Sequence, residues 1–347
     1  MTPSRLQPDS GYAWRRGYLL VAFTALVWGL NFPVLKVGLE YSPPWLYTAL
    51  RILLGAVMMF AVAAALGILR LPRRADLPVV FSVGLLQNMG FIGLLTAGME
   101  FMPAGRAAIL AYTSPIWVVP AATLFLGERM TVPRSLGVGL GLAGVMAMFN
   151  PFSVPWGNPA TFIGAGLILA ATMVWTLGLI HVRRHNWHGD VLSLMPWQLL
   201  SSVLVLVPIA FLLEDPATIR WEAPFVWNIV FSGAIASGFA VAAQVGAMRS
   251  LPAVSMSLGS LAVPAVGFVA AIVLLAERPS LGDVLGFFLI AGGIVTVALS
   301  DRRAAVRDAA LRASVPAPPG TASTDTEPGE PVDQPQNTGT LRSGDIP

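Results

Sequence analysis

The side chains that could do chemistry lie mostly inside long apolar stretches. Asn31, Arg51, Gln87 and Asn88 are each surrounded by aliphatic residues. Amides donate and accept hydrogen bonds, and a guanidinium offers a fork of donors that fits a carboxylate. Such residues can bind a polar solute. Alternatively, Asn31 hydrogen-bonds a neighbouring helix and Arg51 extends toward a polar boundary, as Lys36 is also expected to do.

Catalytic chemistry lacks its usual residues. The 18 acidic residues lie in loops, in tails or at the ends of apolar runs, and there is neither a cysteine nor a GxxxxGK[ST] phosphate loop. Three histidines, His181, His185 and His188, have a spacing that suits a metal site on a helix. With no acidic partner evident for them, we expect an ordinary solvated loop. We therefore expect no catalytic residue, metal or cofactor, and no ATP-driven activity.

Further polar and aromatic residues accompany the first four. Trp28 and Asn31 are three positions apart and share a helical face, and Trp175 follows a similar pattern later in the chain. Indole rings supply apolar and stacking surface for a solute. The predicted substrate-binding residues are Trp28, Asn31, Arg51, Gln87, Asn88, Tyr112, Thr113, Trp175, Trp197, Gln198, Gln244, Ser257 and Ser260.

The elements that must position these residues are membrane-spanning helices. The chain is 11% charged and 55% hydrophobic, whereas soluble proteins are about 25% charged. Crossing a bilayer takes about 20 apolar residues per helix. The apolar runs do not alternate as the strands of a β-barrel would. Ten runs meet the helical requirement: 18–39, 44–69, 77–98, 104–127, 132–149, 159–181, 191–213, 225–248, 253–276 and 281–300.

A stretch of 47 residues occurs twice. Shifted by 149 positions, residues 102–148 match residues 251–297 at 12 positions without a gap. The matches include Pro115 with Pro264, and Glu128 with Glu277. Prolines that interrupt helices in matching positions of two halves indicate a transport site, although a plain kink would also explain them. We predict that Pro115, Pro264, Glu128 and Glu277 have structural or gating roles.

The distribution of arginines predicts the orientation. With the N-terminus inside, the inner segments hold sixteen arginines, and the outer loops and their edges hold three. Because basic loops stay in the cytoplasm, both termini are expected there. Five spans per half is an odd number, so the halves insert upside down relative to each other. The expected organisation is a cytoplasmic segment 1–16, a repeat 17–149, a linker 150–158, a repeat 159–300 and a disordered cytoplasmic tail 301–347.

These features resemble the EamA-type permeases of the drug/metabolite transporter superfamily over nearly all of residues 18–300. The resemblance rests on Trp28-Gly29-x-Asn31-Phe32 with Lys36, on Arg51 seven residues after a proline, on Ala97-Gly98 with Pro103-Ala104, and on the repeated proline and Glu-Arg pairs. It implies an all-α polytopic membrane protein, with ten transmembrane helices as two inverted five-helix repeats. It also implies a central cavity and export or exchange of small metabolites. The second half departs from this pattern, since it lacks equivalents of Lys36 and Arg51.

We therefore expect a secondary transporter of the inner (plasma) membrane. It would move a small organic metabolite, such as an amino acid or an aromatic compound, by alternating access. Its partners would be this solute and the lipid bilayer, and the basic pI of about 9.7 requires no nucleic acid. Glycine-rich runs around Gly137 and Gly293 are expected to pack helices or to form a homodimer. The alternatives are a non-transporting sensor or scaffold whose tail recruits a partner, and an intramembrane enzyme.

Overall fold

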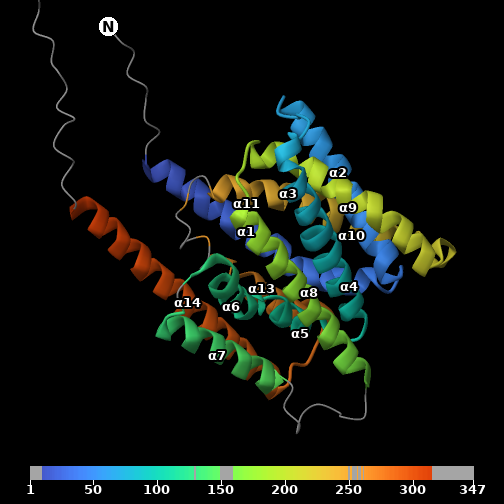
Figure 1. Cartoon of the computed structure of the whole chain (residues 1–347). Helices are drawn as coiled ribbons and strands as arrows, with labels where there is room; N and C mark the ends of the chain where they lie inside the picture. The colour runs from blue at the N-terminus through green and yellow to red at the C-terminus, as the bar shows by residue number, and fades with distance from the viewer. Residues whose placement is uncertain are drawn as a thin grey trace, which may run out of the picture. The chain divides into compact units, whose positions relative to one another are not determined.

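Every regular element in the described part of the chain is a helix (Figure 1). The computed structural model describes residues 10–128, 130–148, 159–248, 251, 256, 259–260 and 262–314. Eight helices are long and apolar enough to cross a membrane, and Val132–Met148 and Ala262–Leu275 are shorter apolar helices. This fits a polytopic membrane protein. The eight long helices are Arg15–Gly38, Pro44–Ala65, Arg74–Glu100, Ala104–Leu126, Pro159–Arg184, Val191–Leu213, Ala223–Ala247 and Leu281–Ser300.

In the first half, proline residues mark where helices begin. Pro44 opens α2 at its first turn, where a missing N–H costs no hydrogen bond. The predicted interruption before Pro115 is confirmed, because one helix ends at Ala111 and the next begins at Ser114. The elements are α1 (Ser10–Gly38), α2 (Pro44–Ala65), η1 (Arg74–Asp76), α3 (Leu77–Ser82), η2 (Val83–Phe91), α4 (Ile92–Glu100), α5 (Ala104–Ala111), α6 (Ser114–Leu126) and α7 (Val132–Met148).

The second half has a similar order of elements. These are α8 (Pro159–Arg184), α9 (Val191–Leu213), η3 (Pro216–Thr218), α10 (Ala223–Ile229), η4 (Val230–Phe239), α11 (Ala240–Met248), α13 (Ala262–Leu275) and α14 (Leu281–Ser314). The disordered tail expected from residue 301 is wrong for residues 301–314, because α14 continues through them. Alanine and arginine dominate this stretch, and both favour helix. The predicted linker 150–158 and residues 315–347 lie outside the described residues.

The third span of each half contains a π-helical segment. η2 interrupts the helix that starts with α3, and η4 interrupts the helix that starts with α10. Hydrogen bonds in a π-helix join residues five apart, and such segments occur frequently at functional sites. η4 begins 147 residues after η2, and α9 begins 147 residues after α2. The two irregularities therefore occupy matching places in the two halves.

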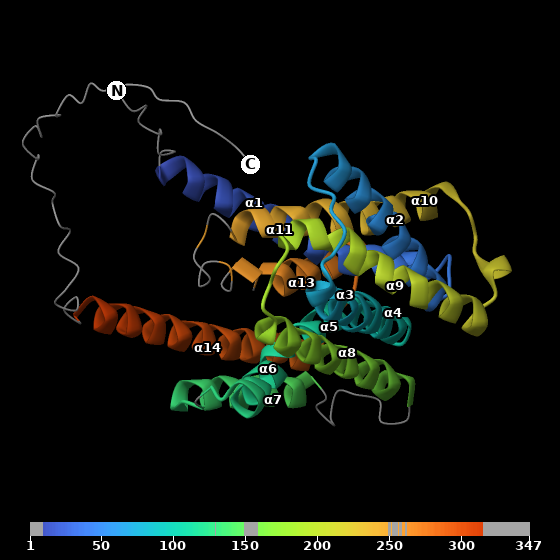
Figure 2. The same ribbon diagram turned by 45° about the horizontal axis from the view of Figure 1, so that its top comes forward.

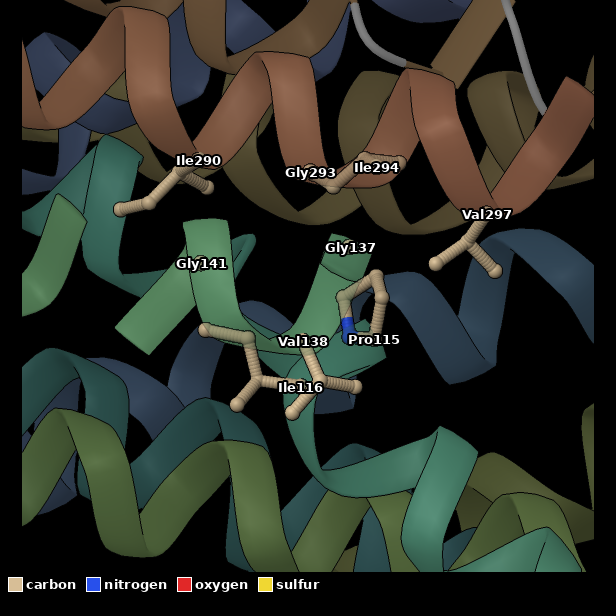
Figure 3. A pocket seen from close by; sticks show the side chains of 9 residues that line it. All are labelled: Pro115, Ile116, Gly137, Val138, Gly141, Ile290, Gly293, Ile294 and Val297. Carbon is tan, nitrogen blue, oxygen red and sulfur yellow. The ribbon is translucent and has the colours of Figure 1, made fainter. Parts of the chain in front are cut away.

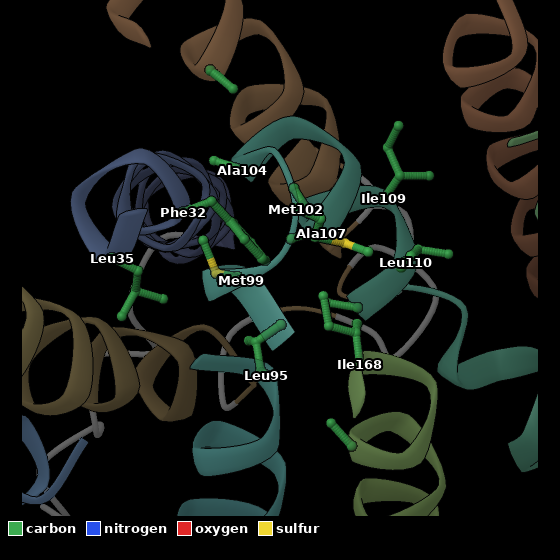
Figure 4. Packing of buried hydrophobic residues seen from close by; sticks show 14 of the residues in the cluster. Phe32, Leu35, Leu95, Met99, Met102, Ala104, Ala107, Ile109, Leu110 and Ile168 are labelled. Carbon is green, nitrogen blue, oxygen red and sulfur yellow. The ribbon is translucent and has the colours of Figure 1, made fainter. Parts of the chain in front are cut away.

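The helices of one half pack mainly against helices of the other. α2 packs on α9 and on η4, and α9 packs in turn on η2. α1 lies along α13 and α11, while α8 lies along α4, η2 and α6 (Figure 2). The largest core cluster joins α1, α4, α5 and α8, and its small residues allow close approach (Figure 4). Its labelled members are Phe32, Leu35, Leu95, Met99, Met102, Ala104, Ala107, Ile109, Leu110 and Ile168.

α7 and α14 meet through glycines, as the sequence predicts for packing helices. A Cβ on Gly137 would lie 2.7 Å from the carbonyl oxygen of Gly293, and one on Gly144 would lie 2.9 Å from that of Gly286. The early glycine of α7 thus meets the late glycine of α14, so the two helices run antiparallel. This contact lies within a single chain, in the compact unit Met1–Ala304.

Gly293→Ala is expected to destabilise the fold, while Gly292→Ala is not. A Cβ on Gly293 would lie 2.5 Å from the Gly137 carbonyl oxygen, whereas one on Gly292 meets nothing within 4 Å. Overpacking of this kind costs about 1–3 kcal/mol. The thermal unfolding midpoint in detergent should fall for Gly293→Ala and stay level or rise for Gly292→Ala. Equal midpoints for the two variants would contradict the α7–α14 contact.

Candidate functional site

Arg51 is the main charged group of a polar cluster between α1, α2 and η4. Its side chain comes from the middle of α2, and the residue is only 5% exposed. Its Nη2 donates to Ser237 Oγ at 3.3 Å, and its Nε has no hydrogen-bond partner. Within the described residues no carboxylate pairs with this guanidinium. A buried cation with unused donors suits an anionic group such as a solute carboxylate.

Two serines of η4 connect Arg51 to Asn31. Ser237 Oγ donates to the carbonyl oxygen of Ser232 at 2.9 Å, and Ser232 Oγ donates to Asn31 Oδ1 at 2.9 Å. Trp28 Nε1, one turn before Asn31, donates to the carbonyl oxygen of Ala236 at 3.0 Å. The structure thus brings three predicted residues, Trp28, Asn31 and Arg51, onto one polar strip.

A buried tyrosine extends this strip on α2. Tyr47 is fully buried and its hydroxyl donates to Asn228 Oδ1 at 2.6 Å. Asn228 Nδ2 donates to the carbonyl oxygen of Val34 at 2.6 Å. Tyr47 lies four residues before Arg51, so both side chains project from the same face of α2. The cluster therefore runs along the contact of the first two helices with the third span of the second half.

The matching place in the other half is polar but uncharged. Gln198 is the eighth residue of α9, as Arg51 is of α2, and it is 5% exposed. Gln87 lies over Gly178, and a Cβ added to Gly178 would lie 2.8 Å from Cγ of Gln87. The ring of Trp175 lies 5.0 Å from that of Phe91. Of the two matching contacts, the one between α2 and η4 contains the buried cation Arg51, and the one between α9 and η2 has Gln198 in that place.

The other predicted binding residues have varied surroundings. Trp197 Nε1 donates to the carbonyl oxygen of Arg70 at 2.8 Å, beyond the end of α2. Thr113 Oγ1 donates to the carbonyl oxygen of Leu110 at 2.7 Å, within its own turn. Tyr112, Asn88, Gln244 and Ser260 are partly buried. Ser257 lies outside the described residues.

Pro115 lines an apolar crevice away from the polar strip (Figure 3). The lining comes from α6, α7 and α14 and is aliphatic, with three glycines, so the crevice suits helix packing better than a polar solute. Pro264 is buried in the first turn of α13. The lining residues are Pro115, Ile116, Gly137, Val138, Gly141, Ile290, Gly293, Ile294 and Val297.

The repeated glutamates have different partners. Glu277 accepts hydrogen bonds from Ala104 N at 2.6 Å and Gly105 N at 3.0 Å, at the N-terminus of α5. Free N–H groups at a helix start favour an anion. Glu128 instead forms ion pairs with Arg134 at 2.9 Å and with Arg183 at 3.2 Å. Glu277 thus joins the two halves through a helix cap, and Glu128 binds arginines.

Further contacts join the two halves and are not evident from the sequence. Glu214 accepts from Trp45 N at 3.0 Å and from Leu46 N at 2.7 Å, at the start of α2. Burial raises the pKa of Glu214 and outweighs the opposing effect of these two N–H groups. Arg106 pairs with Asp283 through two bonds of 2.8 and 3.1 Å. No local pattern in the sequence links these partners, which are more than 160 positions apart.

Comparisons with known proteins agree with the predicted resemblance. The model of the EamA-like transporter family matches twice, at residues 15–150 and 162–299. "Uncharacterized transporter YvbV" of Bacillus subtilis (strain 168) is 30% identical, over 81% of this chain and 91% of its own. A "Probable amino-acid metabolite efflux pump" of Salmonella typhimurium (strain LT2) is 27% identical, over 81% of this chain and 94% of its own.

A solved crystal structure has the same fold. It superposes with a TM-score of 0.60 at 22% identity, covering 84% of this chain and 98% of the other. The two matches of the family model and the eight long apolar helices lead to one conclusion. This chain is a multi-pass membrane protein that belongs to the EamA-like transporter family.

Proposed function

We propose that this protein is a secondary transporter that exports or exchanges a small organic carboxylate, such as an amino acid or an aromatic acid. The buried guanidinium of Arg51 carries this proposal, because its Nε lacks a partner and its Nη2 makes one long bond to Ser237. Such a group in the membrane interior is costly unless it binds an anion during function. The efflux pump of Salmonella typhimurium supports the choice of an amino acid by its name.

The packing of glycines supports two inverted repeats. Gly286 and Gly293 are the repeat counterparts of Gly137 and Gly144. Gly137 packs on Gly293, which is the counterpart of Gly144. Gly144 packs on Gly286, which is the counterpart of Gly137. A two-fold axis that relates the two halves converts the first of these contacts into the second. Because α7 and α14 run antiparallel, that axis lies across the helices, in the plane of the membrane.

Unequal surroundings of equivalent groups support alternating access. Glu277 caps α5 across the halves, whereas its counterpart Glu128 binds arginines. In an inverted-repeat transporter, the halves exchange conformations between the two states. In the opposite state we expect Glu128 to cap the chain near Ala253 and Glu277 to be released. The structure would then represent the state that is closed at the Glu277 end.

The orientation follows from the arginines. The basic segments before α1, between α2 and α3 and after α8 favour a cytoplasmic position for these ends. Both termini would then be cytoplasmic, the membrane would be the cytoplasmic (inner) one, and the Glu277 end would face outward. The solute would have access from the cytoplasm in this state.

Counterflow in liposomes tests the transport function. Purified protein is reconstituted with a high internal concentration of one unlabelled solute, and entry of the labelled form is followed. Amino acids and aromatic acids should enter transiently, while their carboxamide analogues should not, because an amide carries no charge for Arg51. Deletion of residues 315–347 should leave this flux intact, whereas a scaffold would lose its activity. A protein that moves neither acids nor amides would contradict the proposal.

A further inference from the structure

Asp76, His185 and His188 form a compact cluster that is separate from the polar strip around Arg51. Each residue offers one possible ligand atom, and these three atoms all lie within 4.8 Å of one another. Asp76 lies at the end of η1, just before α3, and both histidines lie just after α8. The fold thus provides the acidic partner that the histidines lack in the sequence.

The distances within the cluster suit a four-coordinate metal ion. His185 Nε2 lies 3.0 Å from Asp76 Oδ1, and His188 Nδ1 lies 3.5 Å from the same oxygen. Bonds of about 2.0 Å in a tetrahedral zinc site place neighbouring ligand atoms about 3.3 Å apart. The two spacings to Asp76 Oδ1 lie on either side of that value, and the ligand nitrogens of the two histidines lie within 4.8 Å of each other, so side-chain shifts would bring all three residues around one ion.

One oxygen of the carboxylate is buried without a partner. The side chain of Asp76 is fully buried, and its Oδ2 has no hydrogen-bond partner, whereas Oδ1 also accepts from His188 N at 3.1 Å. Buried carboxylate oxygens are normally satisfied. Gly189 lies beside Oδ2, since a Cβ there would be 3.3 Å from this atom. A cation bound by both oxygens of the Asp76 carboxylate would satisfy Oδ2 as well.

The cluster is also accessible. The side chain of His188 is 45% exposed, while that of His185 is 9% exposed, so an ion can enter past His188. Two imidazoles and one carboxylate favour zinc, nickel, cobalt or copper over magnesium and calcium, which prefer oxygen ligands. We infer that Asp76, His185 and His188 bind one divalent transition-metal ion, with the remaining coordination positions filled by water.

The ion would connect the two halves. Asp76 precedes the third span of the first half, and the histidines follow the first span of the second half. A bound ion would therefore restrain these two segments relative to each other. The inference rests on the cluster alone, and it stands whether or not the protein transports a carboxylate.

Metal binding by the full-length protein tests the inference. The protein should be purified in detergent without a polyhistidine tag, treated with chelator and titrated calorimetrically with Zn²⁺. We expect one ion per chain, no heat with Mg²⁺, and visible absorption bands of tetrahedral type with Co²⁺. His188→Ala should lower the affinity at least 10-fold, as should His185→Ala. His188 is well exposed, so its replacement is expected to leave folding intact.

His181→Ala is the matched control, because His181 lies one turn before His185 and outside the cluster. This variant should bind zinc as the original protein does. Asp76→Asn should weaken binding, with elution as a single monodisperse peak in size exclusion as the check on folding. If the protein takes up no zinc, or if His188→Ala and His185→Ala bind it unchanged, the cluster is a plain hydrogen-bonded contact and the inference is wrong.

Discussion

Arg51→Gln should reduce carboxylate transport by about 10- to 150-fold. Hydrogen bonds to a charged group contribute about 1.5–3 kcal/mol, and each 1.4 kcal/mol corresponds to a factor of ten. Glutamine keeps the polar character and most of the length but loses the charge and the donor fork. The transport rate of Arg51→Lys should lie between those of the original protein and Arg51→Gln, because lysine keeps the charge without bidentate geometry. The measurement is the initial rate of counterflow over a range of solute concentrations.

Two further observations separate this effect from misfolding. Arg15→Gln makes the same chemical change at an exposed position of α1 and should leave the rate unchanged. The thermal unfolding midpoint of Arg51→Gln should not fall, because the substitution removes a buried charge that has no acidic partner among the described residues. A transport rate close to that of the original protein would show that Arg51 does not bind the solute.

In the proposed alternating-access mechanism, Glu277→Ala should open the end of the protein at which Glu277 caps α5. The variant leaves Ala104 N and Gly105 N without their acceptor. Each of these charge-assisted bonds contributes about 1.5–3 kcal/mol, so the loss of even one of them should shift the ratio of the two states by about 10- to 150-fold. The chain contains no cysteine, so spin labels at Phe101→Cys and Arg278→Cys, both exposed, report the separation of the segments that meet there. Pulsed EPR should show a longer distance in the variant.

Two substitutions serve as controls for this shift. Glu100→Ala removes an exposed glutamate at the same end and should leave the distance distribution unchanged. Glu128→Ala removes the group proposed to close the opposite end, so the population should stay in the state described here. If Glu277→Ala and Glu100→Ala give the same distances, the cap does not control closure.

Much of the architecture could be predicted from the sequence, because the bilayer restricts the possibilities. Apolar runs of about 20 residues can cross it only as helices. The break before Pro115 follows from the missing N–H of proline. The close packing of Gly137 and Gly293 follows from their lack of a side chain. These features depend on local chemistry, and local chemistry can be read along the chain.

The composition of the polar strip was harder to predict. The sequence predicts Trp28, Asn31 and Arg51 as polar residues within apolar runs, but it does not show that Ser232 lies beside them. Residues five apart point in different directions on an α-helix. In η4 the bonding joins residues five apart, so Ser237 Oγ reaches the carbonyl oxygen of Ser232. The α-helical periodicity of the sequence therefore could not show that Ser232 and Ser237 lie close together.

The histidine cluster shows a second limit. The spacing of His181, His185 and His188 is compatible with a metal site, but the sequence predicts a solvated loop because no acidic partner is evident. Asp76 lies 109 and 112 positions before His185 and His188. Asp76 stands near the arginines of an interhelical segment, where an acidic residue is common. Its burial comes from the contact of the two halves, which one sequence does not reveal.

The exchange of packing partners between the halves has a consequence for biogenesis. The surfaces that α2 presents to α9 and η4 have no partner until the ribosome has synthesised residues up to about 239. The first five helices would therefore enter the membrane as a loose set and wait there with Arg51 uncovered. Assembly of the two halves would then be late, and quality-control proteases would act on this intermediate.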